Sequence, residues 1–100
     1  MFATIRRYQT VSPAKITPLI NDGLIPLISE IKGFEGYYCL DLGDGMMSSV
    51  TLFDTREAAE QCNQMVVEWG LKNTESLLTK KFEPFIGEVV AQKQPAHALT

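Results

Sequence analysis

Residues 34–54, FEGYYCLDLGDGMMSSVTLFD, constrain the fold more than any other stretch of the chain. Glycine, aspartate and glycine at 43–45 separate two runs rich in tyrosine, valine, threonine, leucine and phenylalanine, which predicts two strands joined by a tight turn. After Glu35, the only charged residues before the end of the hairpin are Asp41 and Asp44, both close to the turn. Because an antiparallel hairpin commonly leaves one polar face in water, we expect both faces of this one to be covered.

A further strand is predicted before the hairpin, at residues 2–9, where successive side chains point to opposite faces. This alternation places Arg6 and Tyr8 on one face and Arg7 on the other. We expect one arginine to point toward the helices and the other toward the opposite side of the sheet. For either arginine, the alternative to a role in a binding site is a structural ion pair with Glu88 across the sheet.

A helix is predicted between this strand and the hairpin, because apolar side chains recur every three or four residues over 16–31. Ser12 and Pro13 suit a helix start, and Pro18 offers an alternative one. Pro26 lies inside the pattern and should kink the helix, since proline has no N–H group and crowds the preceding turn.

A second helix and a last strand are predicted after the hairpin. The helix covers residues 55–79, with a threonine N-cap and a bend at Gly70. Because proline is excluded from a central strand, Pro84 should precede the last strand, which we expect at 85–92. The polar remainder, 93–100, is expected to be a mobile C-terminal tail.

The predicted order of elements is β-α-β-β-α-β. This order indicates an α+β, ferredoxin-like fold with four antiparallel strands and both helices on one face of the sheet. A single domain would cover residues 1–92. Two helices can cover only one face, and the hairpin carries apolar and small polar side chains on the other. Because exposed apolar patches usually mark interfaces, we expect a homodimer formed by packing sheet against sheet.

Composition and charge argue against several classes of protein. The net charge of −3 and the pI of about 5.0 argue against nucleic acid as a main partner. No apolar run approaches the roughly 20 residues of a membrane helix, and the first residues lack a signal-peptide core, so we expect a cytoplasmic protein. Cys39 and Cys62 are too few and too far apart to predict a metal site or a disulfide framework.

Residues 23–69, GLIPLISEIKGFEGYYCLDLGDGMMSSVTLFDTREAAEQCNQMVVEW, resemble the dimeric α/β-barrel superfamily, and within it the antibiotic biosynthesis monooxygenase-like domains. The most specific parts are the glycines and aromatics at 33–38, the turn at 43–45 and the helix at 55–69. The resemblance extends over about residues 1–92. It implies that two sheets form a barrel at the dimer interface, and that each subunit holds a pocket between its own sheet and helices.

The superfamily includes cofactor-independent monooxygenases of polycyclic phenols, haem-degrading enzymes, small isomerases and proteins without known activity. Its haem-degrading members use an asparagine on the first strand and a histidine on the second helix. Here the first strand has no asparagine, and the only histidine is His97. The resemblance thus implies a monooxygenase-like enzyme that acts on a small aromatic or quinone-like substrate without a cofactor or metal. The alternative is a non-catalytic module of the same fold that binds a small ligand or mediates assembly.

The phenol-oxidising members place asparagine, tryptophan, tyrosine and arginine around the substrate, and the same residue types occur here. The candidate substrate-binding residues are Tyr8, Tyr38, Asn63, Trp69, Asn73, Arg6 and Arg7. Each candidate also has a plainer structural role, such as a core tryptophan, a solvent-facing asparagine or an ion-paired arginine. The sequence assigns no catalytic residue.

Overall fold

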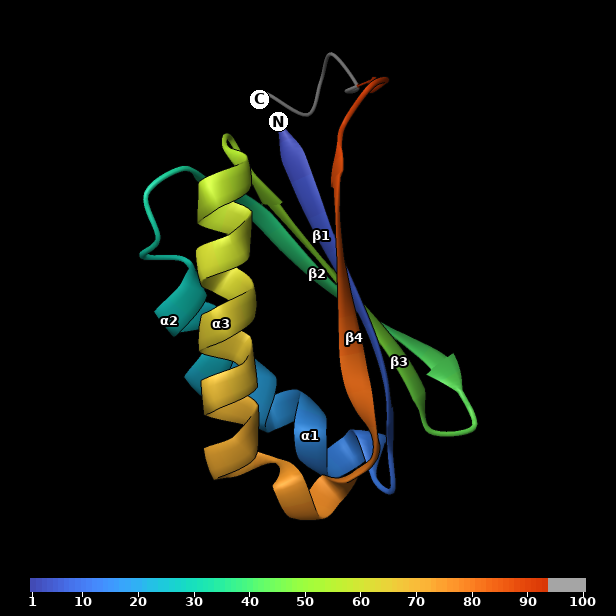
Figure 1. The fold of residues 1–100 in the computed structure, drawn as a ribbon. Coiled ribbons are helices and arrows are strands. Elements are labelled where there is room, and N and C mark those ends of the chain that lie inside the picture. The colour runs from blue at the N-terminus through green and yellow to red at the C-terminus, as the bar shows by residue number, and fades with distance from the viewer. Residues whose placement is uncertain (94–100) are drawn as a thin grey trace, which may run out of the picture.

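The computed structural model describes residues 1–93, apart from the side chains of residues 80–82, and contains a four-stranded antiparallel sheet with helices on one face (Figure 1). The strands lie in the order β2-β3-β1-β4. This arrangement confirms the predicted α+β, ferredoxin-like fold. The strands are β1 (Phe2–Thr10), β2 (Phe34–Gly43), β3 (Met46–Phe53) and β4 (Leu78–Glu88).

The helical segments lie together on one side of the sheet in Figure 1. The first predicted helix consists of three consecutive pieces, and the second is one long helix followed by a short turn. These segments are α1 (Pro13–Leu19), the π-helical turn η1 (Ile20–Leu24), α2 (Ile25–Ile28), α3 (Arg56–Asn73) and the 3₁₀ turn η2 (Glu75–Leu77).

The first helix begins at Pro13, the earlier of its two predicted starts. The Ser12 side chain caps it by accepting a hydrogen bond from a backbone N–H of the first turn. The distortion expected at Pro26 takes the form of a π-helical turn just before it, in which the Ile25 N–H donates to the carbonyl of Ile20. A widened turn relieves the crowding that a proline ring causes in the preceding turn.

Helix α3 runs without interruption through Gly70, where a bend was predicted, and ends at Asn73. Thr55 caps its start as expected, because its hydroxyl accepts a hydrogen bond from the Ala58 N–H at 3.2 Å. At the other end, Thr74 donates both its backbone N–H and its hydroxyl to the carbonyl of Gly70. The predicted continuation of the helix is wrong, because the chain turns through η2 into β4.

Strand β4 begins at Leu78 and ends at Glu88, so its predicted start after Pro84 is wrong. The prediction excluded proline from a central strand, but β4 lies at the edge of the sheet. An edge strand needs hydrogen bonds on one side only and therefore tolerates a proline. Pro84 lies directly opposite Arg6 of β1 in the register of the two strands.

The hairpin of β2 and β3 is confirmed. Its turn residues Gly43, Asp44 and Gly45 have φ values of 89°, 55° and 80°, a left-handed conformation that glycine adopts without steric strain. Side chains along both strands point to the two faces of the sheet. Tyr38, on the face without helices, is 62% exposed, whereas Phe53, on the helix side, is fully buried.

The core lies between the helices and one face of the sheet. Its largest fully buried side chain is Arg6, which is 1% exposed. A buried arginine is unusual, since charged residues are rarely removed from water without a charged partner. The buried apolar side chains around it are Tyr8, Ile16, Ile20, Leu24, Ile28, Ile31, Met47, Phe53, Ala58, Ala59, Cys62 and Val66.

The face without helices, called the open face below, carries a row of apolar side chains in register. Tyr38 lies opposite Val50, Val50 opposite Ile5, and Ile5 opposite Phe85, so the row crosses all four strands. Tyr38 and Phe85 are each about 60% exposed and Ile5 is 41% exposed. Within residues 1–93, no helix covers this row.

Candidate functional site

A small cavity lies between the sheet and the helices. Its walls come from β1, β2, β3, the first helical segments, α3 and the start of β4, and they include Arg6, Tyr8, Tyr37 and Trp69. Its volume is about 30 Å³, which is room for roughly two water molecules. Pockets that enclose a small ligand usually measure roughly 300 Å³ or more. In this form the cavity can hold a polar group of a ligand, but not a ring.

A larger groove adjoins the cavity, between the first helical segments and the edge strand β2. It measures about 660 Å³ and runs around the edge of the sheet, because Asn21 and Ile25 line it together with Tyr37 on the helix side and with Tyr38 and Val50 on the open face. Ile20 and Tyr37 line both the groove and the cavity. These two side chains therefore separate the two spaces, and the groove alone has the size of an ordinary ligand site.

The guanidinium group of Arg6 is held by side chains of β3 and α3. Its Nη2 donates to Thr51 Oγ1 at 2.6 Å, and its Nη1 donates to Asn63 Oδ1 at 3.1 Å. The same Nη1 lies 3.8 Å from the Cys62 sulfur, in donor geometry. Thr4 Oγ1 donates to Asn63 Oδ1 at 2.7 Å, which orients the amide toward Arg6. These bonds fix the arginine at one wall of the cavity.

The ionisable groups around Arg6 are neutral near pH 7. Burial raises the pKa of Tyr8, and contact with Cys39, whose sulfur lies 3.4 Å from the Tyr8 hydroxyl, raises it further. Burial also raises the pKa of Tyr37 and of the Cys62 thiol, although the positive charge of Arg6 opposes each shift. The arginine is therefore the charge in a wall of otherwise uncharged groups.

Trp69 closes the cavity on the α3 side. Its indole packs against η1 so closely that a Cβ atom at Gly23 would lie 3.2 Å from the indole nitrogen. The predicted candidate Asn73 lies one turn further on, is exposed, and donates its side-chain amide to the Trp69 carbonyl at 2.8 Å. Asn73 is thus the last residue of α3, bonded to the last helical turn, and it does not line the cavity.

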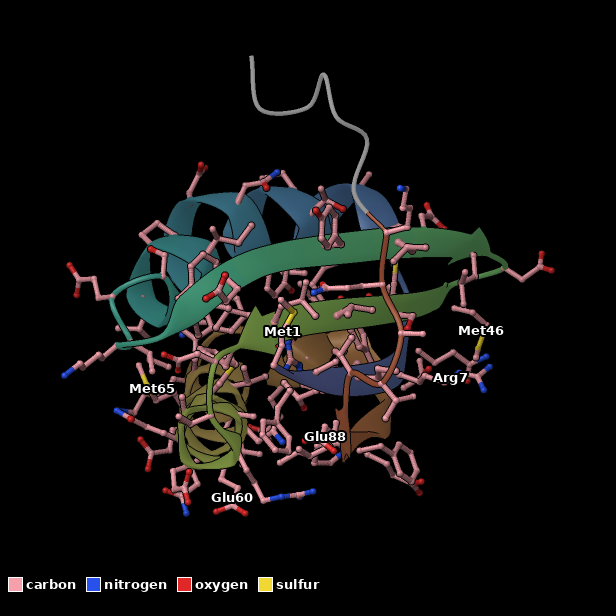
Figure 2. The ribbon with its side chains drawn as sticks, turned by 90° about the horizontal axis from the view of Figure 1, so that it is seen from above. Met1, Arg7, Met46, Glu60, Met65 and Glu88 are labelled. Carbon is pink, nitrogen blue, oxygen red and sulfur yellow. The ribbon has the colours of Figure 1, made fainter. Side chains whose placement is uncertain are left out.

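Arg7 points away from the cavity, onto the open face. In Figure 2 it lies on the side of the molecule away from Met65 of α3. The predicted ion pair of an arginine with Glu88 is wrong, because Glu88 lies opposite Phe2 in the sheet. Arg7 lies opposite Glu83 instead. The prediction failed because we expected β4 to start after Pro84. The true start at Leu78 gives the strand a different register with β1.

The structure therefore brings some of the predicted site residues together and separates others. Arg6, Tyr8 and Trp69 line the cavity. Asn63 does not line it but accepts a hydrogen bond from Arg6. Tyr38 lines the groove and is largely exposed. That any of them binds a substrate stays a prediction.

Three neighbours of Arg6 were missed as site residues. Tyr37 lies with its ring centre 6.0 Å from the guanidinium carbon, and Thr4 and Thr51 form part of the hydrogen-bonded set. Thr4 had a signal, because residues two apart in a strand share a face. Thr51 had none, since its position beside Arg6 depends on the pairing of β1 with β3.

Within residues 1–93, no group of three histidine, cysteine, aspartate or glutamate side chains could hold a metal ion. In the same part of the chain, each helix is too short or too polar to cross a membrane.

Comparisons with known proteins identify the fold. No protein-family model matches the chain, and no curated protein matches it. Among solved structures, it is similar to a protein of unknown function from Nitrosomonas europaea, at 20% identity and a TM-score of 0.75 over 95% of this chain and 94% of that one. It is also similar to SnoaB, a cofactor-independent oxygenase from Streptomyces nogalater, at 13% identity and a TM-score of 0.69 over 94% and 96% of the chains.

A third similar structure is a dimeric ferredoxin-like protein from an uncultured marine organism, at 18% identity and a TM-score of 0.69 over 94% of this chain and 98% of that one. The fold that the sequence resemblance implied is thereby confirmed over nearly the whole chain. At such identities, likeness of fold does not establish likeness of reaction.

Proposed function

We propose that this chain is a cofactor-independent monooxygenase-like enzyme that acts on a small aromatic or quinone-like substrate. The observation that carries the proposal is a ligand-sized groove that meets, at Tyr37, a small and mostly apolar cavity lined on one wall by Arg6. The groove offers apolar and aromatic walls to a ring, and the cavity offers Arg6 and Tyr8 to an oxygen atom on that ring. The similarity in fold to a cofactor-independent oxygenase supports this assignment.

The proposed chemistry asks little of the protein beyond binding and positioning. A hydroxylated ring that becomes a quinone gains one oxygen atom and loses two hydrogen atoms, and these leave as water with the second atom of O₂. The substrate is the reductant and O₂ the oxidant, so the electrons balance without a cofactor. The protein contributes an environment shielded from water and groups that favour the ionised form of the substrate.

Binding of a ring requires a local rearrangement, since the cavity itself holds only about 30 Å³. Ile20 and Tyr37 would move to join the groove to the cavity. Ile20 is the first residue of the π-helical turn η1, and such turns occur frequently at functional sites. The ring would then lie in the groove, with its oxygen in the cavity.

The test is oxygen consumption by the full chain with a panel of hydroxylated aromatics and hydroquinones. We expect turnover with at least one compound, and a loss of about tenfold to a hundredfold in kcat/KM for Trp69→Ala, because the cavity wall opens to water. Leu71→Ala, on the exposed side of the same helix, is the matched control and should keep its activity. Absence of turnover across the whole panel would contradict the enzymatic function.

A second candidate function is favoured by the small volume of the cavity: a non-catalytic module of the same fold that binds a small ligand or mediates assembly. The two functions separate in one experiment. A compound that binds, as followed by the fluorescence of Trp69, but never accelerates oxygen consumption would favour the binding module. Trp69 is the single tryptophan of the chain, so the signal comes from the cavity wall alone.

We also propose that the protein is a homodimer that pairs through the open face. The apolar row from Tyr38 to Phe85 supports this, because so long an exposed row usually marks an interface. The similarity to a dimeric ferredoxin-like protein agrees with it. Sedimentation that gives a stable monomer at micromolar concentration would contradict the proposal.

A further inference from the structure

The largest buried side chain of the core is also a permanent positive charge. Arg6 is 1% exposed, and arginine keeps its proton at any pH that the protein experiences. Among the described residues, its guanidinium group donates to Thr51 and Asn63 and lies near the Cys62 sulfur. All three are uncharged near pH 7, so hydrogen bonds orient the arginine but do not balance its charge.

The strands beside Arg6 do not balance the charge either. In the register of the sheet its neighbours are Ser49 on β3 and Pro84 on β4, both uncharged. Tyr37 also contacts Arg6, through its side-chain hydroxyl and through a ring whose centre lies 6.0 Å from the guanidinium carbon, but this phenol is neutral because burial raises its pKa. A buried charge usually has a partner of opposite sign, because removing it from water is unfavourable.

The position of the cavity indicates where such a partner would lie. Arg6 lines it directly, together with Tyr37 and Trp69. Its volume of about 30 Å³ suits one oxygen-bearing group, because that is the space of roughly two water molecules. A ring attached to that group would extend past Tyr37 and Ile20 into the groove.

We propose that Arg6 is the charge partner of an oxyanion conjugated to an aromatic ring, which enters the cavity as the charged end of the ligand. Asn63 and Thr51 act as positioning residues, because their oxygens hold the two guanidinium nitrogens toward the cavity wall. This inference rests on the proposed function and specifies it: the site selects the ionised form of its aromatic ligand, and Arg6 determines that selection.

Arg7 provides the matched comparison. It is the same residue type on the same strand, one position away, but it is exposed on the open face. A general effect of positive charge on anion binding would involve both arginines. A site in the cavity involves Arg6 alone.

The test is a calorimetric titration of the full chain with 2-naphthoate and with its neutral amide, 2-naphthamide. Wild type should bind the carboxylate at least about tenfold more tightly, a difference of about 1.4 kcal/mol. Arg6→Met should reduce the preference to within about twofold, while Arg7→Met should keep it. A wild type without preference, or an Arg6→Met variant that retains it, would overturn the inference. If neither compound binds wild type, the inference and the aromatic site both fail.

Thermal unfolding separates this role from a structural one. If Arg6 is a charge partner for a ligand, Arg6→Met should leave the Tm of the ligand-free protein unchanged or raise it, because methionine fills similar space without a buried charge. Asn63 Oδ1 would keep its bond from Thr4. A clear fall in Tm would assign Arg6 to stability instead. Should that variant not fold, the comparison of the two naphthalene compounds on wild type still decides the charge preference.

The outcome is also independent of turnover. Preference for the carboxylate without any oxygen consumption would leave the inference standing and refute the enzymatic function. Oxygen consumption with equal binding of charged and neutral rings would do the reverse.

Discussion

Arg6 and Arg7 are neighbours in the sequence, yet strand β1 gives them opposite environments. Arg6 is buried against α3 and bonds to uncharged groups, whereas Arg7 is exposed and lies opposite Glu83. The two faces of the sheet differ in the same way. The helix face buries a charge, and the open face exposes a row of apolar side chains. Both the buried charge and the exposed apolar row are unfavourable for a protein in water. We propose that each has a partner outside the single chain, an anion on the helix face and a second copy of the chain on the open face.

The largest expected effect is a difference in unfolding free energy between truncations on the two faces of the sheet. Phe53 is fully buried on the helix face, so Phe53→Ala should lower the free energy of unfolding by about 3–5 kcal/mol. Phe85 is 60% exposed on the open face, so Phe85→Ala should change it by roughly 0.5 kcal/mol or less in dilute protein. Urea unfolding of both variants measures this. Equal losses would mean that the open face is covered within one chain.

The next effect concerns assembly. Ile5 lies in the middle of the apolar row, between Val50 and Phe85. Ile5→Asp should weaken the proposed dimerisation by about a hundredfold or more, which is about 3 kcal/mol, since it puts a charge into the middle of the apolar row. Sedimentation velocity measures the shift to monomer. Leu71→Asp, on the exposed surface of α3, is the control, and a similar shift there would refute the interface.

The smallest effect is a dependence of stability on pH that belongs to the helix face. Burial raises the pKa of the Cys62 thiol above its ordinary value of 9.0, and Arg6 only partly opposes this. The unfolded chain therefore releases this proton at lower pH than the folded one. The stabilisation is complete below about pH 9 and is lost as the pH rises through the folded pKa. Urea midpoints should fall above about pH 9, and less steeply for Cys62→Ala. Identical slopes would exclude Cys62 as the cause.

Local patterns predicted most of the fold. The two-residue period of β1 separated Arg6 from Arg7, and the glycines on either side of Asp44 predicted the turn. Both features depend only on residues close together in the sequence. The start of β4 did not follow, because Pro84 is acceptable only in an edge strand, and edge position is a property of the whole sheet.

The candidate site was predicted as a set of residue types rather than as a geometry. Asn63 and Arg6 were both named, but their hydrogen bond joins residues 57 positions apart and depends on how α3 packs on β1. Asn73 was named because it follows Trp69 by one helical turn, yet it faces solvent. The repeat of apolar residues in the sequence predicts which face of a helix or strand a side chain lies on. Which neighbour it contacts depends on how the elements pack.

Pro84 has a consequence for how the protein behaves at high concentration. A long edge strand is a template on which further chains can add by backbone pairing, and that is a route to aggregation. A proline in β4 removes one backbone donor from such a ladder. Growth along this edge is thereby discouraged, whereas β2, the other edge of the sheet, contains no proline.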